Sequence, residues 1–337
     1  IEVLESYLRA NPADGQAMHL LGSAFLATGQ NAKATTLMQE ALKTKDNPAY
    51  RTVLGLSLIR SGQGGSGVAE LEAAYKQDAT QTQAGVTLVG LYLRSGRATK
   101  AVTVAQGLVK QQPNNPNFFN VLGMAKGQAG DLPGAKAAFE QAVKLNDAFV
   151  APKINLARIE IANKAYDAAA VRLAAILKVN EKNTEAMGEM AVLSERRGQP
   201  AEAQRWLEKA NDLAGPKEVQ WGLALSDFHL RHDRPAQALE AIKKVSGKLP
   251  NDLGVLMAYA KAQIANRDMA GGKSTLTSAT RVADYNPIPQ VQIALLQLSA
   301  NNMPGAAYSL EKALSTQPDF LPAQALMTEV ELRQGDA

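Results

Sequence analysis

The chain has 337 residues, which suits two ordinary domains or one extended array, and its Ala- and Leu-rich composition with only 5% aromatic residues favours helices. The net charge of +4 comes from scattered Lys and Arg, which argues against a nucleic-acid-binding surface. The absence of Cys excludes structural disulfides and Cys-based zinc sites, and no apolar run approaches the roughly 18 residues that a membrane span needs.

The chain begins inside a helical pattern. Residues 1–9 read as the second helix of a hairpin, and the Asn11-Pro12 pair reads as the turn that follows it. The first residue is Ile, and no signal peptide is recognisable. We therefore expect a piece of a longer protein, with more repeats on both sides.

From residue 15 onward the sequence repeats with a period of about 34 residues, a length typical of stacked helical hairpins. In this reading each repeat has a first helix (helix A) and a second helix (helix B). A small or apolar residue marks the middle of each helix A. These residues are Gly22, Gly55, Val89, Gly123, Ala157, Ala191, Ser226, Ala260 and Leu295.

The turn between the two helices follows in phase. Its position is expected to need a left-handed backbone conformation, which glycine adopts most easily. It is occupied by Gly29, Gly62, Gly96, Gly130, Lys164, Gly198, Asp233, Arg267 and Asn302. A small residue then lets helix B approach helix A, at Ala34, Gly67, Ala101, Ala135, Ala169, Ala203, Ala238, Gly272 and Ala307. In the second repeat, the glycine run that follows Gln63 is expected to loosen the turn.

The last segment, residues 321–333, reads as a lone helix A. The predicted organisation is therefore one array over residues 1–337, with a partial repeat at 1–14, nine repeats at 15–320 and a partial repeat at 321–337. No hairpin buries its apolar face alone, so neighbouring hairpins stack into one continuous core.

The pattern resembles the tetratricopeptide repeat family over nearly the whole chain. The resemblance is strongest at Asn115-Pro-Asn-Phe-Phe-Asn-Val-Leu-Gly, at Gly130-Asp-Leu-Pro-Gly-Ala, and at Arg197-Gly-Gln-Pro-Ala-Glu-Ala. It implies an all-α fold, a right-handed superhelical α-solenoid of about nine hairpins, and a non-catalytic protein that binds protein or peptide partners.

Motifs for catalysis and cofactor binding are weak. Gly271-Gly-Lys-Ser resembles the end of a phosphate-binding loop, but Arg267 replaces the first glycine and the segment falls in a helix B. His229 and His232 have a spacing that could seat a metal, yet His229 also occupies an aromatic packing position of its repeat. We predict no enzyme, cofactor or metal site.

The inner, concave surface of such an array is lined by helix A. Helical periodicity places a set of mostly polar side chains on this surface, where five arginines could bind carboxylates or a peptide tail. Four of these arginines also lie in the last turn of helix A, where a cation suits the negative end of the helix. The set is His19, Ser23, Arg60, Arg94, Asn120, Met124, Gln128, Arg158, Arg196, Asp227, Arg231, Lys261 and Gln292.

A narrower resemblance is to the tetratricopeptide lipoproteins of the PEP-CTERM/exosortase system. The stretches that carry it are Pro152-Lys-Ile-Asn-Leu-Ala-Arg, Leu249-Pro-Asn-Asp-Leu and Gln317-Pro-Asp-Phe-Leu-Pro. It implies a periplasmic-side envelope scaffold for exopolysaccharide export or protein sorting, with a lipid anchor outside this chain. The alternatives are a cytosolic adaptor or co-chaperone that binds peptide termini, and an accessory module of a carbohydrate-active enzyme. The oligomeric state stays open.

Overall fold

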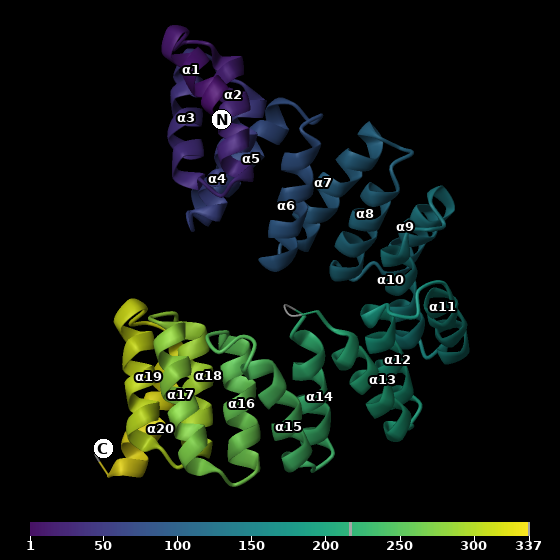
Figure 1. Cartoon of the computed structure of the whole chain (residues 1–337), viewed down its shortest axis with the longest axis vertical. Coiled ribbons are helices and arrows are strands. Elements are labelled where there is room, and N and C mark those ends of the chain that lie inside the picture. Colours follow the sequence, from purple (N-terminus) through teal and green to yellow (C-terminus); the bar gives the residue numbers. More distant parts are fainter. Residues whose placement is uncertain (216–217, 336–337) are drawn as a thin grey trace. The chain divides into compact units, whose positions relative to one another are not determined.

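The computed structural model describes residues 1–215 and 218–335. Within these ranges the chain forms twenty helices, α1 to α20, and no strand (Figure 1). Within each of the two compact units described below, consecutive helices pack against one another, and the predicted all-α solenoid is confirmed. No described helix combines the length and apolarity that crossing a membrane requires.

The A helices follow the predicted phase. They are α2 (Gly15–Ala27), α4 (Pro48–Arg60), α6 (Thr82–Arg94), α8 (Pro116–Gln128), α10 (Val150–Ala162), α12 (Thr184–Arg196), α14 (Gln220–Arg231), α16 (Leu253–Ala265), α18 (Pro287–Ser299) and α20 (Leu321–Gln334). Several begin with Pro at the first helical position, where its missing N–H would have no helical partner in any case.

The B helices alternate with them. They are α1 (Glu2–Ala10), α3 (Asn31–Thr44), α5 (Gly64–Gln77), α7 (Ala98–Gln111), α9 (Leu132–Leu145), α11 (Tyr166–Val179), α13 (Pro200–Leu213), α15 (Pro235–Ser246), α17 (Met269–Ala283) and α19 (Met303–Thr316). The described chain thus begins with a lone helix B and ends with a lone helix A, as predicted. The final two residues of the predicted partial repeat, 336–337, lie outside the described residues.

Close packing of helix A on helix B explains the small residues at the two marker positions. A Cβ on Gly123 of α8 would lie 2.5 Å from the Phe139 ring of α9, and one on Gly67 of α5 would lie 2.7 Å from the carbonyl oxygen of Gly55. Ala135 is fully buried at the corresponding position of α9. A larger side chain at any of these positions would push the two helices apart.

The hairpin turns adopt the expected left-handed conformation whether or not they contain glycine. Gly96 has φ +71° and Gly130 has φ +86°, while Lys164 has φ 61° and Arg267 has φ 64°. The non-glycine turns carry a conformational cost of about 1–2 kcal/mol each. The conformation is therefore imposed by the hairpin and not by the residue type.

The predicted register of the ninth repeat is wrong by one residue. The left-handed residue is Asn301, and Asn302 instead caps α19. Ala294 is fully buried, whereas Leu295 is 50% exposed, and the small residue of α19 is the buried Ala306. Without a glycine in this turn, the sequence offered no residue that distinguishes the two registers.

The glycine run of the second repeat does not loosen its turn. Helix α5 begins at Gly64, directly after the left-handed Gly62, as the B helices do elsewhere. The glycines therefore lie in the first turn of the helix, where the backbone is already held by the hairpin.

The chain divides into two compact units, unit 1 (Ile1–Ala165) and unit 2 (Tyr166–Ala337). Each contains its own stacked hairpins and its own apolar clusters. Within each unit, A helices of neighbouring repeats contact one another, as α2 does α4 and α14 does α16. Among the B helices the clearest such contact is between α17 and α19. The side of each unit on which A helices lie next to one another is here called its inner face.

Candidate functional site

In unit 1, two of the predicted inner-face side chains bind the backbone of the neighbouring repeat. Arg60, at the end of α4, donates from Nη1 to the carbonyl oxygen of Leu26 at 2.7 Å. Gln128, at the end of α8, donates from Nε2 to the carbonyl oxygen of Leu93 at 2.7 Å. Both acceptors lie in the last turn of the preceding helix A, where carbonyls lack a helical partner. These two side chains therefore join neighbouring repeats.

A second polar group of unit 1 connects α8 to α10. Asn155 donates from Nδ2 to Oδ1 of Asn120 at 3.1 Å, and its own Oδ1 accepts from Nη1 of Arg158 at 3.0 Å. Met124 lies one turn beyond Asn120 on α8, and 46% of its side chain is exposed. The inner face here combines fixed amide groups with an exposed thioether, a mixture suited to a polar and apolar peptide contact.

Arg94, at the end of α6, is different. It is exposed, and among the described residues it forms no hydrogen bond or ion pair. Its Nη1 folds back towards Gly90, 3.6 Å from the place where a Cβ on that residue would lie. The absence of a side chain at Gly90 leaves room for the guanidinium, whose donors remain open to a ligand.

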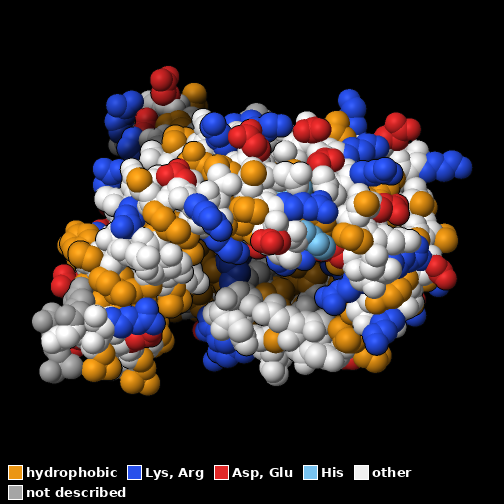
Figure 2. All heavy atoms as spheres, turned by 90° about the horizontal axis from the view of Figure 1, so that it is seen from below, with side chains coloured by type: hydrophobic (Ala, Val, Ile, Leu, Met, Phe, Trp, Pro, Cys, Tyr) orange, Lys and Arg blue, Asp and Glu red, His pale blue; other side chains and the backbone are white. Residues whose placement is uncertain are grey.

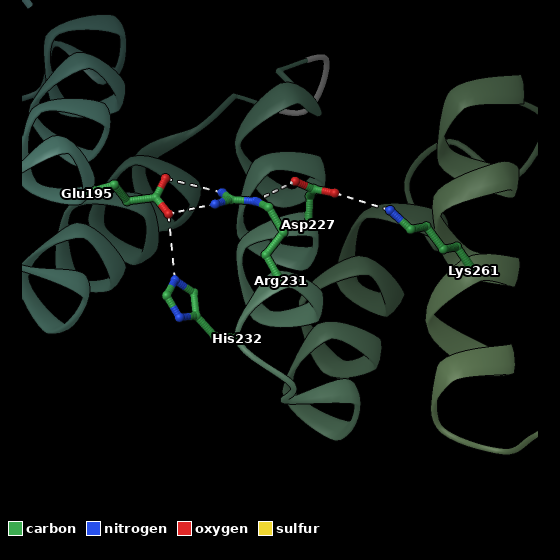
Figure 3. Close-up of polar contacts among 5 residues, drawn as sticks. All are labelled: Glu195, Asp227, Arg231, His232 and Lys261. Carbon is green, nitrogen blue, oxygen red and sulfur yellow. Dashed lines mark hydrogen bonds and ion pairs between the residues drawn. The ribbon is translucent and has the colours of Figure 1, made fainter. Parts of the chain in front are cut away.

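Unit 2 carries an ion-pair network across three A helices (Figure 3). Arg231 of α14 binds Glu195 of α12 with both terminal nitrogens, at 2.7 and 3.1 Å. Its Nε also donates to Asp227, one turn back on α14, at 3.0 Å. Lys261 of α16 reaches the other oxygen of Asp227 at 3.2 Å. His232 Nε2 lies 3.6 Å from Glu195.

These four residues, Glu195, Asp227, Arg231 and Lys261, are called the ion-pair ladder below. Burial by itself would raise the pKa of Asp227, but hydrogen bonds from Arg231 and Lys261 outweigh it and hold that pKa below its usual range. The bond to Glu195 raises the pKa of Arg231 further above its ordinary value. Both shifts favour the charged forms of Asp227 and Arg231, so the contacts of the ladder join groups of opposite sign.

Three other predicted residues take no part in such networks. His19 lies against the ring of Tyr50, with centroids 5.6 Å apart, and burial lowers its pKa. Arg196 is exposed and has no hydrogen-bond or ion-pair partner among the described residues. Ser23 is half-buried on α2.

Gln292 does not occupy the position for which it was chosen. It was predicted from a register of the ninth repeat that is displaced by one residue. In the observed register, the residue equivalent to His19 and Asn120 is Val291. The side chain of Gln292 is exposed on α18 at a neighbouring position.

The inner faces are consequently less positive than five arginines suggest. Arg60 binds a carbonyl of the neighbouring repeat, Arg158 binds Asn155 of its own helix, and Arg231 is neutralised by two carboxylates. Figure 2 shows Lys and Arg interspersed with Asp, Glu and hydrophobic side chains over the surface in view. The open cations of the predicted set are Arg94 in unit 1 and Arg196 in unit 2.

The structure separates the histidine pair considered for a metal. His229 is buried and lines a pocket between α13 and α15, whereas His232 lies beside Glu195. Among the described residues no three His, Asp or Glu side chains gather as metal ligands would. The Gly271-Gly-Lys-Ser segment lies in α17 as predicted, and the Gly271 N–H donates to Asp268, which caps that helix.

Glu195 and Asn155 are the inner-face residues that sequence reasoning missed. Each binds a partner about one repeat away, since Glu195 pairs with Arg231 and Asn155 with Asn120. A search for complementary side chains separated by one period would have found both. Periodicity was used instead to select positions one repeat at a time, so such pairs escaped notice.

Family comparison agrees with the repeat assignment. One tetratricopeptide repeat family matches residues 58–125, and a second matches residues 1–50 and 120–180. The matched ranges together extend over most of unit 1 and into unit 2.

Among known proteins, the chain is similar to the cellulose synthase operon protein C of Pseudomonas fluorescens (strain SBW25). The two are 23% identical over 334 residues, which cover 93% of this chain and 24% of that protein. The chain thus spans about a quarter of the length of this relative.

Two solved structures share the fold. A tetratricopeptide repeat protein from Parabacteroides merdae has a TM-score of 0.57 at 17% identity, covering 86% of this chain and 99% of that one. Yeast Tom70 has a TM-score of 0.51 at 13% identity, covering 96% of this chain and 89% of that one. At these identities the likeness concerns the fold alone.

Proposed function

The chain belongs to the tetratricopeptide repeat family, and from this we propose that it is a non-catalytic scaffold that binds a protein segment along the inner face of unit 1. The observation that carries the proposal is the open guanidinium of Arg94. The carbonyl of the preceding residue, Leu93, is bound by Gln128, and the exposed Met124 lies one turn before Gln128 on α8. A scaffold of stacked hairpins presents such a row of side chains without needing to move.

The chemistry of this surface favours a segment with a carboxylate. Arg94 has donors to spare, and a planar guanidinium binds a carboxylate with two parallel hydrogen bonds. The amides of Asn120 and Gln128 already serve the scaffold, so they position the surface and do not compete for the ligand. Met124 adds an adaptable apolar contact beside the charge.

A binding series with acidic C-terminal peptides tests this proposal. Arg94→Glu is expected to weaken binding by tenfold or more, because a charge-assisted bond contributes about 1.5–3 kcal/mol. Lys110→Glu, an exposed change of the same charge on α7, is the matched control. Equal binding by wild type and Arg94→Glu, or an equal loss with Lys110→Glu, would contradict the proposal.

We further propose that the full-length protein serves exopolysaccharide production or PEP-CTERM protein sorting at the cell envelope. The similarity to a cellulose synthase operon protein supports an exopolysaccharide setting, and the subgroup motifs support the sorting system. A periplasmic location and a lipid anchor belong to the same proposal. Fractionation of cells that express the full-length protein tests it. Recovery with membranes only when an upstream lipobox Cys is intact supports the anchor, and recovery in the cytosol counts against it.

A further inference from the structure

Two pockets open on the B-helix side of unit 2, outside the inner face. One lies between α17 and α19 with α18 as its floor, and its volume is about 290 Å³. The other lies between α13 and α15 with α14 as its floor, and its volume is about 500 Å³. Each is therefore framed by two consecutive B helices and the A helix between them.

The two pockets occupy the same place in the repeat but carry different side chains. Equivalent positions can be found by counting from the buried small residue of each helix, and several of them differ in charge or in side-chain type. The equivalent pairs, with the α13–α15 pocket first, are Asp212 and Arg281, His229 and Gln297, and Glu240 and Tyr308. The α13–α15 pocket is therefore acidic, whereas the equivalent α17–α19 pocket is basic and has an aromatic wall.

Two cations line the α17–α19 pocket without strong partners. The side chain of Lys312 is only 12% exposed, and its Nζ is 4.0 Å from Oδ1 of Asp284. The same Nζ lies 4.7 Å from the ring centroid of Tyr285 and 5.8 Å from that of Tyr308. Arg281 is exposed and has one weak contact, 3.5 Å from Nη2 to the hydroxyl of Ser278. Most of their N–H donors are free for an anion.

A buried amide at the floor supplies a further donor. Gln297 is 2% exposed and lines the pocket, and its Oε1 accepts from Nδ2 of Asn302 at 2.6 Å. Among the described residues its Nε2 has no hydrogen-bond partner. The Nε2 is thus available to a ligand oxygen at the floor of the pocket.

The aromatic side chain of Tyr308 in the pocket lining favours a ring-shaped ligand. Tyr308 is 57% exposed and Tyr285 is 52% exposed, and both lie beside the cation of Lys312. Their rings offer apolar surface with polar tips, which suits a ligand that has both apolar and hydroxylated faces. The volume lies just below the roughly 300–1,000 Å³ of pockets for drug-sized ligands, so one ring fills it.

We propose that the α17–α19 pocket binds a sugar ring that carries a carboxylate. The carboxylate pairs with Lys312 and Arg281, a ring oxygen or hydroxyl accepts from Gln297, and the apolar face of the sugar rests on Tyr308. An acidic peptide is less suitable, because the pocket is a single compact site between two helices and not an extended groove. A neutral sugar would leave Arg281 without a carboxylate partner and Lys312 with only the distant Asp284.

Calorimetric titration of the chain with tri-galacturonic acid tests the proposal, with cellotriose and tri-glutamate as neutral and peptide comparisons. Tri-galacturonic acid is expected to bind at least tenfold more tightly than either comparison. Lys312→Gln and Arg281→Gln are each expected to weaken its binding by roughly tenfold to a hundredfold, the range for hydrogen bonds to charged groups. Tyr308→Ala should weaken it as well, since the ring loses its stacking surface.

Lys244→Gln is the matched control, because Lys244 occupies the position of Lys312 in the acidic pocket. It should leave binding unchanged. Arg281 is exposed, so its variant tests the pocket even if Lys312→Gln impairs folding. No binding of tri-galacturonic acid, equal loss with Lys244→Gln, or equally tight binding of tri-glutamate that Tyr308→Ala does not alter would overturn the proposal. Arg94→Glu should leave sugar binding unchanged. The proposal for this pocket and the proposal for the peptide surface of unit 1 can therefore be contradicted independently.

Discussion

The inner faces of the two units solve the same structural problem with different chemistry. In unit 1, Arg60 and Gln128 bind backbone carbonyls of the preceding repeat. In unit 2, Arg231 occupies the equivalent place but binds the carboxylate of Glu195. Every helix C-terminus offers backbone carbonyls as acceptors, whereas an ion pair needs a particular residue one repeat away. Arg94 in unit 1 and Arg196 in unit 2 use neither kind of acceptor among the described residues.

The hairpin turns differ between the units in the same way. Four of the five turns in unit 1 place glycine at the left-handed position, whereas unit 2 has Gly198 followed by three residues with a Cβ. Unit 2 keeps the fold despite this local cost. Tertiary packing of the small residues is thus the common element of both units, and local preferences are secondary.

The largest expected effect tests that common packing. Ala135→Leu in α9 and Ala203→Leu in α13 place a bulky side chain at fully buried positions between helix A and helix B. Each should lower the free energy of unfolding by about 1–3 kcal/mol through overpacking. Chemical denaturation measures both. A neutral result in one unit only would show that the two units do not share the same packing.

The turns give the next largest effect. Gly96→Ala is expected to destabilise unit 1 by about 1 kcal/mol, because φ of +71° is unfavourable for alanine although no atom lies within 4 Å of its Cβ. Arg267→Gly in unit 2 should stabilise by a smaller amount, since glycine relieves the strain but gains entropy in the unfolded chain. Thermal unfolding of the two variants checks the opposite signs. The same sign for both would contradict a common turn conformation.

The ion-pair ladder should contribute less, because its members are substantially exposed to solvent. Arg231→Ala is expected to cost about 0.2–1 kcal/mol for each exposed pair that is lost. The cost should shrink as salt is added, whereas that of Arg60→Ala should depend less on salt, since its acceptor is an uncharged carbonyl. A double-mutant cycle with Glu195→Gln isolates the pair between the two helices. A coupling energy that salt does not reduce would show that the ladder acts through packing.

The smallest expected effect concerns pH. Burial lowers the pKa of His229 below its ordinary 6.5, so the unfolded chain binds more protons than the folded chain between the two values. The stability of unit 2 is then fully present above about pH 6.5 and declines as the pH falls through the lowered pKa. His229→Gln, which copies the residue found at Gln297, should reduce the change in unfolding midpoint between pH 7.5 and pH 5.5. An unchanged pH dependence would exclude this contribution, since His19 remains in both proteins.

Much of the architecture could be predicted because the repeat is a local pattern. The left-handed turns at Gly29, Gly62 and Gly198, and the buried Ala34 and Ala135, appear where the period put them. The prediction failed in the ninth repeat, where Asn301 and Asn302 are chemically alike and no glycine marks the turn. Local preference could not distinguish the two adjacent registers there, and the burial of Ala294 and Ala306 in the core decided between them.

The candidate site could be predicted only in part. Helical periodicity placed Arg60, Arg94 and Arg231 at the ends of A helices, as the structure shows. It could not tell which guanidinium would be satisfied, because that depends on an acceptor in another repeat. Helical periodicity also could not predict the pockets of unit 2, because each pocket is formed by three helices. Their different chemistry is evident only when equivalent positions two repeats apart are compared.

The amino-acid sequence by itself determined the hairpin, its period and the faces that pack, because these depend on residues within one repeat and on spacing along a helix. The tertiary structure alone decided which polar groups remain open. Arg94 and Arg231 occupy the same repeat position with the same side chain, yet Glu195 lies within reach of Arg231 while Arg94 has no such partner among the described residues. The availability of a charge for a ligand depends on what the neighbouring helix brings to it, and stacking alone determines that.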